Sequence, residues 1–384
     1  MPLQRNTLDI PHGCAVDCIS HKLQSNEGFD ISMKIMKKAA AFVAAVSLAL
    51  SLSSCGSDLS WAAKVSKDET VPIGMYIYTQ AANFRTYAQS GMLTTSTALE
   101  KQTLNVSDSD KKATEYLDSE AVKSVKAYAG ALILAKEMKI ELTEQEVTSA
   151  ESSAKEQYDT DKEVYEKNGV AQSSITEYFK NLTLQNNLFN AIYGKDGTNP
   201  VSDKELKQYI KDNYATISYI QQYFLNEDGS AMSDTDKAKI KKQYEKIKKQ
   251  VESGKLKFSD KCKDFEKNAT SYKSGSTKYT TAWDVSDEEG KKIMDLKAGE
   301  MTFLETDSAI VLLQKQKIDY DDAGLKNSRD TLLLRYKFSD FTKDLISKAE
   351  NDKNVSFNQS AFDKFGSATR DFSNLSIPSN YNYY

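Results

Sequence analysis

Hydrophobic positions follow a helical pattern through the first half of the chain. Apolar residues recur every three or four positions, so that each segment carries one apolar face. Pro72, and the pair Thr143 and Glu146 with the spacing of a capping box, mark the starts of two such segments. Helices are therefore expected over about residues 73–87, 110–139, 143–168, 175–193 and from 202 onward.

The period changes at Ala215, where apolar and polar side chains begin to alternate as they do along a strand. From there to about residue 318 the pattern predicts the order strand, helix, helix, strand, helix, strand, strand. A Gly- and Ser-rich stretch at 272–278 is expected to be a loop. The expected strands cover about 215–224, 280–285, 301–304 and 308–318, and the helices about 233–252, 258–267 and 286–296.

A helical pattern returns at Asp321 and continues to about Ala349, before a polar tail that ends in Tyr and Asn. The sequence therefore predicts an α+β protein in which an α+β module interrupts a helical one. The predicted parts are a tether over 55–70, a helical domain over 71–214, an α+β domain over 215–318, a helix over 319–350 that packs back onto the helical domain, and a tail over 351–384.

The N-terminal part has the pattern of a secretory signal. Lysines precede an apolar run over 39–50, which is too short to span a membrane by itself, and small residues follow. The segment Leu52-Ser53-Ser54-Cys55 resembles the lipobox of bacterial lipoproteins, in which the cysteine is acylated and becomes the first mature residue. The resemblance implies cleavage between Ser54 and Cys55, loss of residues 1–54 and lipid attachment at Cys55. An uncleaved anchor is the alternative.

The signal is complete from Met33 onward, so translation is expected to start at Met33 or Met36 rather than at Met1. Two acyl chains on Cys55 would hold the protein stably at a membrane surface. We therefore expect an extracytoplasmic protein that is lipid-anchored to the bacterial cell membrane.

Composition removes most enzyme chemistry. Both histidines, His12 and His21, and two of the four cysteines precede the signal. The mature chain would contain no histidine, and Cys55 and Cys262 as its only cysteines. This excludes histidine general bases, Ser-His-Asp and Cys-His nucleophiles, His- or Cys-rich zinc sites and a disulfide framework. No metal or cofactor is expected, and no catalytic residue is assigned.

The charge balance is slightly acidic, apart from one basic segment. Without residues 1–54 the chain has 46 basic and 51 acidic residues, a net charge of −5, and nothing indicates nucleic-acid binding. Residues 233–263, however, contain eleven lysines and five acidic residues. The lysines of 237–249 are either the solvated face of a helix or a contact for anionic lipid, wall polymer or acidic clients.

The order of the modules resembles the extracytoplasmic foldases of the PrsA and SurA type. In that family a helical chaperone domain of the SurA N-terminal kind, completed by a C-terminal helix, carries a parvulin-like peptidyl-prolyl isomerase domain. The segment Leu296-Lys297-Ala298-Gly299-Glu300-Met301 is similar to the parvulin turn Leu-Lys-x-Gly-Glu-Val, and Ser218-Tyr219-Ile220 stands where the family has Ser-His-Ile. The resemblance implies a protein that assists the folding of unfolded or extended secreted polypeptides.

The departures from the parvulin pattern limit the expected chemistry. Tyr219 and Ala309 stand at the positions of the family's two groove histidines, so the isomerase domain is expected to be degenerate. Rotation about an X-Pro bond has a barrier of about 20 kcal/mol, which a protein can lower by binding the twisted amide. An active isomerase with an altered groove stays open, as does a substrate-binding or adhesion lipoprotein. The candidate peptide groove consists of Tyr219, Gln221, Trp283, Met294 and Ala309.

Overall fold

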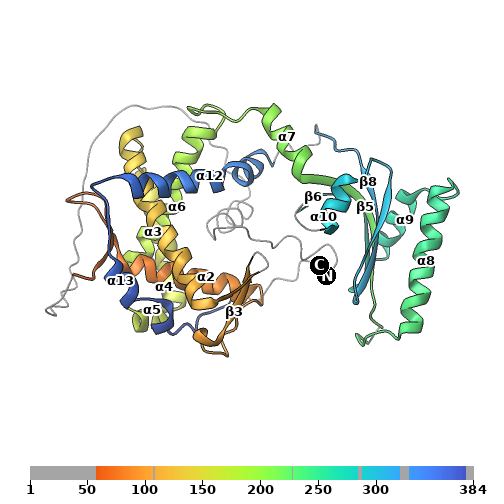
Figure 1. The fold of residues 1–384 in the computed structure, drawn as a ribbon, viewed down its shortest axis with the longest axis horizontal. Helices are drawn as coiled ribbons and strands as arrows, with labels where there is room; N and C mark the ends of the chain where they lie inside the picture. Colours follow the sequence, from red (N-terminus) through yellow and green to blue (C-terminus); the bar gives the residue numbers. More distant parts are fainter. Residues whose placement is uncertain (1–57, 107–108, 227, 284–287, 321–327, 378–384) are drawn as a thin grey trace. The chain divides into compact units, whose positions relative to one another are not determined.

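The computed structural model describes residues 58–106, 109–226, 228–283, 288–320 and 328–377 (Figure 1). The described part of the chain divides into a sheet unit, from Val201 to Tyr336, and a helical unit, which combines the described residues from Asp58 to Pro200 with those from Lys337 onward. Helices and antiparallel sheets together confirm the predicted α+β class. Within the described ranges, no helix has both the length and the apolar character to cross a membrane.

The helical unit is built around α3 (Ala113–Met138), which packs against α2 and α6. The capping box predicted at Thr143 is confirmed: the N–H of Glu146 donates to Thr143 Oγ1 (3.3 Å), and the N–H of Thr143 donates to Glu146 Oε2 (2.7 Å). The other helices of this unit are α2 (Ile73–Gln89), η1 (Leu99–Lys101), α4 (Glu144–Thr160), α5 (Lys162–Asn168), α6 (Gln172–Tyr193), α13 (Gln359–Lys364) and η2 (Ser367–Thr369).

α12 (Arg329–Asn351) belongs to the sheet unit up to Tyr336 and to the helical unit from Lys337 onward. In the helical unit, its Phe341 ring lies 5.6 Å from the ring of Phe189 on α6. It also approaches α3 very closely, because a Cβ atom on Gly130 would lie 1.9 Å from the carbonyl oxygen of Leu345. The late helix therefore supplies one side of the helical unit.

Residues 61–72 form strands rather than the predicted tether. β1 (Trp61–Lys64) pairs antiparallel with β2 (Thr70–Pro72) and with β9 (Ser356–Phe357), and Ala62 and Ala63 are fully buried. Strands of two to four residues are too short to show a clear alternation in the sequence, so the periodicity did not predict them. The fixed part of the chain begins well before residue 71.

A hairpin and an ordered C-terminal segment are further differences from the prediction. β3 (Thr103–Val106) and β4 (Ser109–Lys112) pair before α3, which therefore starts at Ala113 rather than at residue 110. The predicted polar tail is packed along much of its length, because Phe372 and Leu375 are buried within it. These two apolar residues are too isolated in a polar stretch to produce a periodic signal.

The sheet unit contains one antiparallel sheet with the order β6-β5-β8-β7. Its strands are β5 (Tyr214–Tyr223), β6 (Lys273–Ala282), β7 (Met301–Glu305) and β8 (Ala309–Gln316). One face packs against α8 (Asp234–Glu252) and α9 (Phe258–Lys267), and the other against α10 (Glu288–Asp295). The four-stranded antiparallel sheet expected for this part of the chain is present.

Two boundaries in the sheet unit differ from the prediction. α7 (Asp203–Asn213) belongs to this unit, because its Tyr209 ring stacks on Tyr336 at 4.9 Å, so the unit begins at Val201 rather than at Ala215. The predicted loop at 272–278 is largely the first half of β6. Glycine is needed there because a Cβ atom on Gly275 would lie 2.7 Å from Phe265 Cβ on α9.

Candidate functional site

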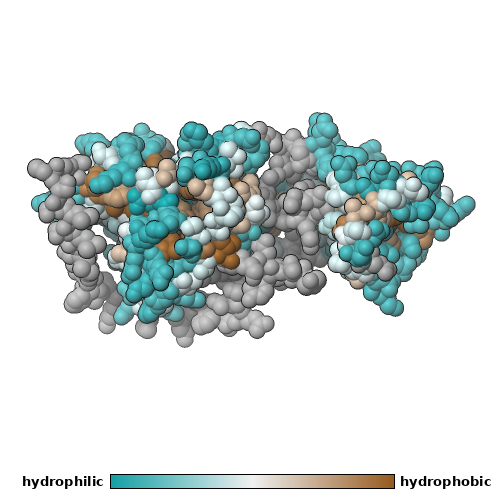
Figure 2. Space-filling view, turned by 90° about the horizontal axis from the view of Figure 1, so that it is seen from below, coloured by the Kyte–Doolittle hydropathy of each residue, from teal (hydrophilic) through white to brown (hydrophobic). Residues whose placement is uncertain are grey.

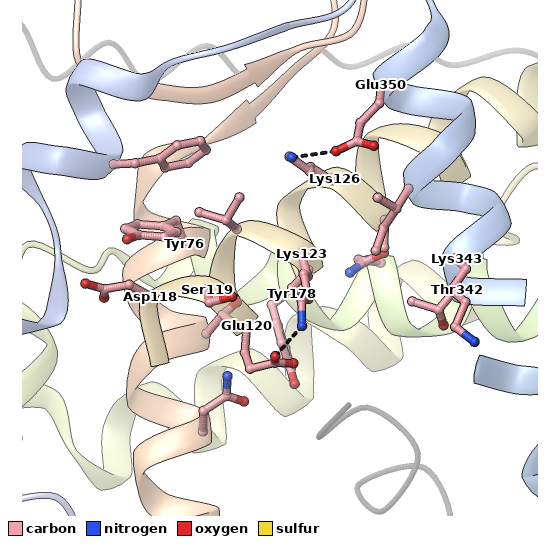
Figure 3. A pocket seen from close by; sticks show the side chains of 18 of the residues that line it. Tyr76, Asp118, Ser119, Glu120, Lys123, Lys126, Tyr178, Thr342, Lys343 and Glu350 are labelled. Carbon is pink, nitrogen blue, oxygen red and sulfur yellow. Dashed lines mark hydrogen bonds and ion pairs between the residues drawn. The ribbon is translucent and has the colours of Figure 1, made fainter. Parts of the chain in front are cut away.

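The helical unit contains a cavity of about 960 Å³. Residues of α2, α3, α6, α12 and α13 line it, and Figure 3 shows side chains from several of these helices converging on the space. Ligand pockets typically measure about 300–1,000 Å³. The cavity is therefore large enough to take a segment that presents several side chains at once.

The deep part of the cavity combines aromatic rings with amide side chains. Tyr76 on α2 and Phe362 on α13 place their ring centroids 4.9 Å apart. Asn181 and Gln185, one helical turn apart on α6, are both buried, and Gln185 Nε2 donates to Asn181 Oδ1 (2.6 Å). An amide side chain can donate and accept at once, as a peptide group can. This floor can therefore pair with a polypeptide backbone without selecting a sequence.

Three helices each contribute an apolar side chain that lines the cavity and remains partly exposed. These are Val122 on α3, Leu182 on α6 and Ile346 on α12. Figure 2 shows hydrophobic residues reaching the surface of the helical unit between hydrophilic ones on the face that it draws. A bound apolar side chain would remove the remaining exposed area of these three residues from water.

Four of the eight charged residues that line the cavity form two ion pairs with one another. Lys123 Nζ donates to Glu120 Oε1 (2.7 Å), and Lys126 Nζ donates to Glu350 Oε1 (2.6 Å), as Figure 3 shows. Both pairs are partly exposed, so each contributes at most about 1 kcal/mol. Glu115 and Lys343 pair with residues outside the lining, and Asp118 and Asp363 form no ion pair with a described residue, so the lining keeps a small excess of negative charge.

Asp118 and Thr342 are two further polar residues of the lining. Asp118 accepts from Gln80 Nε2 (2.6 Å) and from the N–H of Ser367 (2.8 Å), and burial raises the pKa of its carboxyl group. Thr342 Oγ1 on α12 is buried and has no hydrogen-bond partner among the described residues. A buried hydroxyl without a partner gains a hydrogen bond when a ligand supplies one.

The five residues of the predicted groove lie on one side of the sheet. β5 and β8 pair Tyr219 with Leu313 and Gln221 with Val311, on the face that packs against α10. Gln221, Trp283 and Ala309 are buried, with exposed fractions of 5%, 4% and 1%. A peptide can therefore contact these three residues only after the unit rearranges.

Tyr219 and Met294 differ from the other three because both are partly exposed. The ring of Tyr219 lies 5.9 Å from that of Tyr279, and burial raises the pKa of the Tyr219 hydroxyl. These two residues are the part of the predicted groove that stays accessible, and a peptide contact at them stays a prediction.

Both edges of the sheet are protected against strand addition. The edge strand β6 has a bulge in its pairing with β5, beside Ser218. The hydroxyl of Ser218 donates to the carbonyl oxygen of Thr277 at this point (2.8 Å). At the other edge, Lys292 Nζ donates to the carbonyl oxygen of Phe303 in β7 (3.2 Å). Bulges and edge lysines are common protections of exposed strands. Neither edge of the sheet therefore favours the addition of a peptide strand.

The lysines of α8 divide into two sets. Lys241 forms an ion pair with Glu305, and Lys248 with Glu252 (3.7 Å). By contrast, the side chains of Lys242, Lys246 and Lys249 are exposed and form no ion pair with a described residue. Steps of four and three residues place these three on one stripe of the helix. We call them the lysine stripe.

The signal and the lipid-attachment site, with Ser54 and Cys55, lie outside the described residues. In the part of the chain that the structure describes, no group of three or more His, Cys, Asp or Glu side chains is placed to hold a metal ion. Cys262 is fully buried, and burial raises the pKa of its thiol to about 12, so it is unreactive in the folded protein.

Comparisons with known proteins give structural likenesses only. No family model and no curated protein matches the sequence. Similar solved structures include foldase protein PrsA from Lactococcus lactis, with 14% identity, a TM-score of 0.32 and coverage of 80% of this chain and 99% of that one. PrsA from Streptococcus pneumoniae has 15% identity and a TM-score of 0.31, and the match covers 67% of this chain and 95% of that one. PrsA from Bacillus subtilis has 17% identity and a TM-score of 0.23, and the match covers 69% of this chain and 98% of that one. At these TM-scores the likeness assigns no family to this chain.

Sequence reasoning did not predict the cavity. Its lining comes from segments as far apart as Tyr76 and Gly366. The sequence did contain one signal: the buried amides of α6 interrupt an otherwise apolar face. Polar residues at core positions of a predicted helix point to a polar network or to a binding site.

Proposed function

We propose that this protein is an extracytoplasmic foldase of the chaperone type, which binds extended segments of secreted polypeptides in the cavity of its helical unit. The lining of that cavity carries the proposal. Partly exposed apolar side chains from three helices surround a floor of buried amide groups. An unfolded chain presents the matching groups, because it exposes apolar side chains together with unpaired backbone amides.

The lining also sets the strength of binding. Burying Val122, Leu182 and Ile346 fully against a client would contribute up to about 1.5–3 kcal/mol each, less the area that is already buried. Ordering an extended client costs much of this gain. The result is weak, reversible binding with little sequence preference, which suits a protein that must release its clients.

The remaining parts have supporting roles. Acyl chains on Cys55 hold the protein on the outer face of the membrane, as the signal pattern supports. The sheet unit acts as a scaffold with an accessory contact at Tyr219 and Met294. An isomerase must bind the proline ring in an accessible apolar pocket, and the burial of Trp283 and Ala309 argues against that role.

Replacing Leu182 and Ile346 with glutamine tests the cavity. The double variant Leu182→Gln/Ile346→Gln is expected to bind an unfolded model polypeptide at least tenfold more weakly than the parent protein does. Two apolar contacts are lost, and about 1.4 kcal/mol already corresponds to a factor of ten. Suppression of client aggregation, followed by light scattering, should fall in parallel. The measurements use a protein that begins at residue 55 and carries Cys55→Ser, so that both the signal and the acyl chains are absent; we call it the Cys55→Ser protein.

Leu132→Gln provides the matched control, because Leu132 is also partly exposed on α3 but does not line the cavity. It should leave client binding unchanged. If both variants bind the client as the parent does, the cavity is not the client site. Binding of one defined small ligand, without suppression of aggregation, would instead support a substrate-binding lipoprotein.

The lysine stripe provides a second attachment to the membrane. Each lysine near an anionic surface contributes about 1 kcal/mol, so the triple variant Lys242→Gln/Lys246→Gln/Lys249→Gln should bind anionic vesicles at least tenfold more weakly at low salt. The control Lys241→Gln/Lys248→Gln should lose much less, because both of its lysines already have acidic partners. Vesicle co-sedimentation of the Cys55→Ser protein measures both, and equal losses would contradict the stripe.

A further inference from the structure

The side chain of Asn358 fixes the beginning of the helical unit. Asn358 is buried, with an exposed fraction of 7%. Its Nδ2 donates to the carbonyl oxygens of Asp58 (2.9 Å) and Trp61 (3.1 Å), and its backbone N–H donates to the carbonyl oxygen of Ala62 (3.0 Å). The chain is therefore attached to the folded unit from Asp58 onward.

The same side chain begins the helix that forms one wall of the cavity. Asn358 Oδ1 accepts from the N–H of Ala361 (3.2 Å) as the N-cap of α13. Gln359, Phe362 and Asp363 of α13 line the cavity, and the next residue after Asn358 is already one of them. One residue thus connects the start of the folded chain to the cavity wall.

The length of chain between the lipid site and this attachment is very short. Cys55 precedes Asp58 by three residues, which span at most about 10 Å when fully extended. A tether running to residue 70 would instead have reached about 50 Å. Because β1 and β2 lie within residues 61–72, the helical unit is attached much closer to Cys55 than a tether running to residue 70 would require.

We propose that the corner of the helical unit formed by Asp58, Trp61, Lys64 and Asn358 docks on the lipid headgroups, so that the cavity binds client segments as they leave the membrane. This rests on the acylation of Cys55 and on client binding in the cavity, as proposed above. The partner is the headgroup layer that holds the anchor. One wall of the cavity begins at this corner, because Gln359 of α13 lines the cavity and follows Asn358 directly.

The side chains at the corner suit such a layer. Trp61 is partly exposed, and Lys64 Nζ lies over its ring, 4.3 Å from the centroid. Tryptophan and lysine favour the boundary between lipid and water. At this corner the Lys64 ammonium is the polar end, because the indole N–H of Trp61 is buried, and the exposed part of the Trp61 ring is the apolar surface. The corner therefore combines a short covalent anchor with two side chains that can enter the headgroup layer.

Energy transfer to labelled lipid measures the distance. The full acylated protein is placed in phosphatidylcholine and phosphatidylglycerol vesicles that contain a headgroup-labelled acceptor lipid. A donor dye is attached at Lys364→Cys on α13, since Cys55 is acylated and Cys262 is buried. Efficient transfer is expected. A flexible Gly/Ser insertion of about 20 residues between Ser57 and Asp58, with a mean span of about 25 Å, should lower the efficiency at least twofold.

The same Gly/Ser segment added after Tyr384 is the matched control and should leave the transfer unchanged. Inefficient transfer in the parent protein would overturn the docking of the corner, and equal transfer after the insertion would overturn the role of the short tether in it. Client binding by the soluble Cys55→Ser protein tests the cavity separately, so that failure of docking and failure of the proposed function can be told apart.

Asn358→Asp tests the residue itself. Aspartate keeps the oxygen that caps α13 but loses the two donor bonds to Asp58 and Trp61. Residues 58–64 should then be cleaved several-fold faster in limited proteolysis, while client binding in solution is retained. Unchanged protection of these residues would show that Asn358 does not hold the start of the chain.

Discussion

Replacing Gly130 with alanine is expected to force α12 away from α3 and to abolish most client binding. A Cβ atom at this position would lie 1.9 Å from the carbonyl oxygen of Leu345 and 2.6 Å from its carbonyl carbon. Backbone atoms cannot rotate away as a side chain can, so the helix as a whole must shift. Thr342 and Ile346 of α12 would then no longer be in place to line the cavity.

Gly130→Ala is expected to destabilise the helical unit, whereas a glycine-to-alanine change within a helix usually stabilises a protein. Glycine to alanine within a helix normally stabilises by about 1 kcal/mol, through helix propensity. Overpacking at a close contact costs about 1–3 kcal/mol or more, so Gly130→Ala should lower the free energy of unfolding of the helical unit by about 1–2 kcal/mol. Urea titration followed by circular dichroism measures this, and client affinity should fall at least tenfold.

Gly74→Ala is the matched control for Gly130→Ala. A Cβ atom on Gly74 would lie 2.3 Å from Ser174 Oγ, which can take another rotamer, and 2.9 Å from Ser174 Cβ, so α2 and α6 must also shift slightly apart at this end. Gly74 is on α2 and does not contact α12, so client binding should change little. If Gly130→Ala is as stable as the parent protein and binds clients equally well, the close approach of the two helices is not required.

Local signals allowed much of the fold to be predicted. The alternation that begins at Ala215 became β5, the Thr143 capping box begins α4, and the C-cap glycine at 169 adopts the left-handed conformation with a φ of 78°. Each signal depends on neighbouring residues in the sequence. Such rules work because backbone geometry and capping bonds act over one turn or one pleat.

Long-range contacts account for what the sequence did not predict. β1 pairs locally with β2 but also with Ser356–Phe357, almost 300 positions later. The cavity likewise requires the Gly130 approach, which depends on a residue far along the chain. Alternation puts Tyr219 and Gln221 on one face of β5, but it does not reveal what covers that face, and Trp283 and Ala309, which the resemblance assigned to the groove, are buried.

The break between α4 and α5 shows the same limit and gives the second large prediction. The helical pattern continues through Asp161, yet α4 ends at Thr160, and Asp161 has non-helical backbone angles (φ −128°, ψ 34°). Its carboxylate binds two distant groups. Arg85 Nη2 on α2 donates to Oδ2, and the N–H of Ser376 donates to Oδ1 (2.7 Å). Arg85 Nε also donates to the carbonyl oxygen of Ser376 (3.1 Å). One ion pair thus connects three segments of the chain.

Asp161→Ala is expected to lower the free energy of unfolding of the helical unit by about 3–5 kcal/mol. The side chain of Asp161 is only 1% exposed and that of Arg85 14%, so the variant leaves a buried positive charge without its partner. The C-terminal segment should also detach, and limited proteolysis should cleave residues 370–377 much faster. Denaturant titration and peptide mapping measure the two effects.

Two further variants show how much of the effect of Asp161→Ala comes from the unpaired charge of Arg85 and how much from the loss of a carboxylate side chain. Asp159→Ala removes the partner of Lys155 in an exposed pair of the same helix and should cost less than about 1 kcal/mol. Arg85→Met/Asp161→Leu removes both buried charges and should recover much of the stability that Asp161→Ala loses, because apolar residues can replace a buried pair. A double variant as unstable as Asp161→Ala would show instead that the bonds to Ser376, rather than the unpaired charge, hold the C-terminal segment in place.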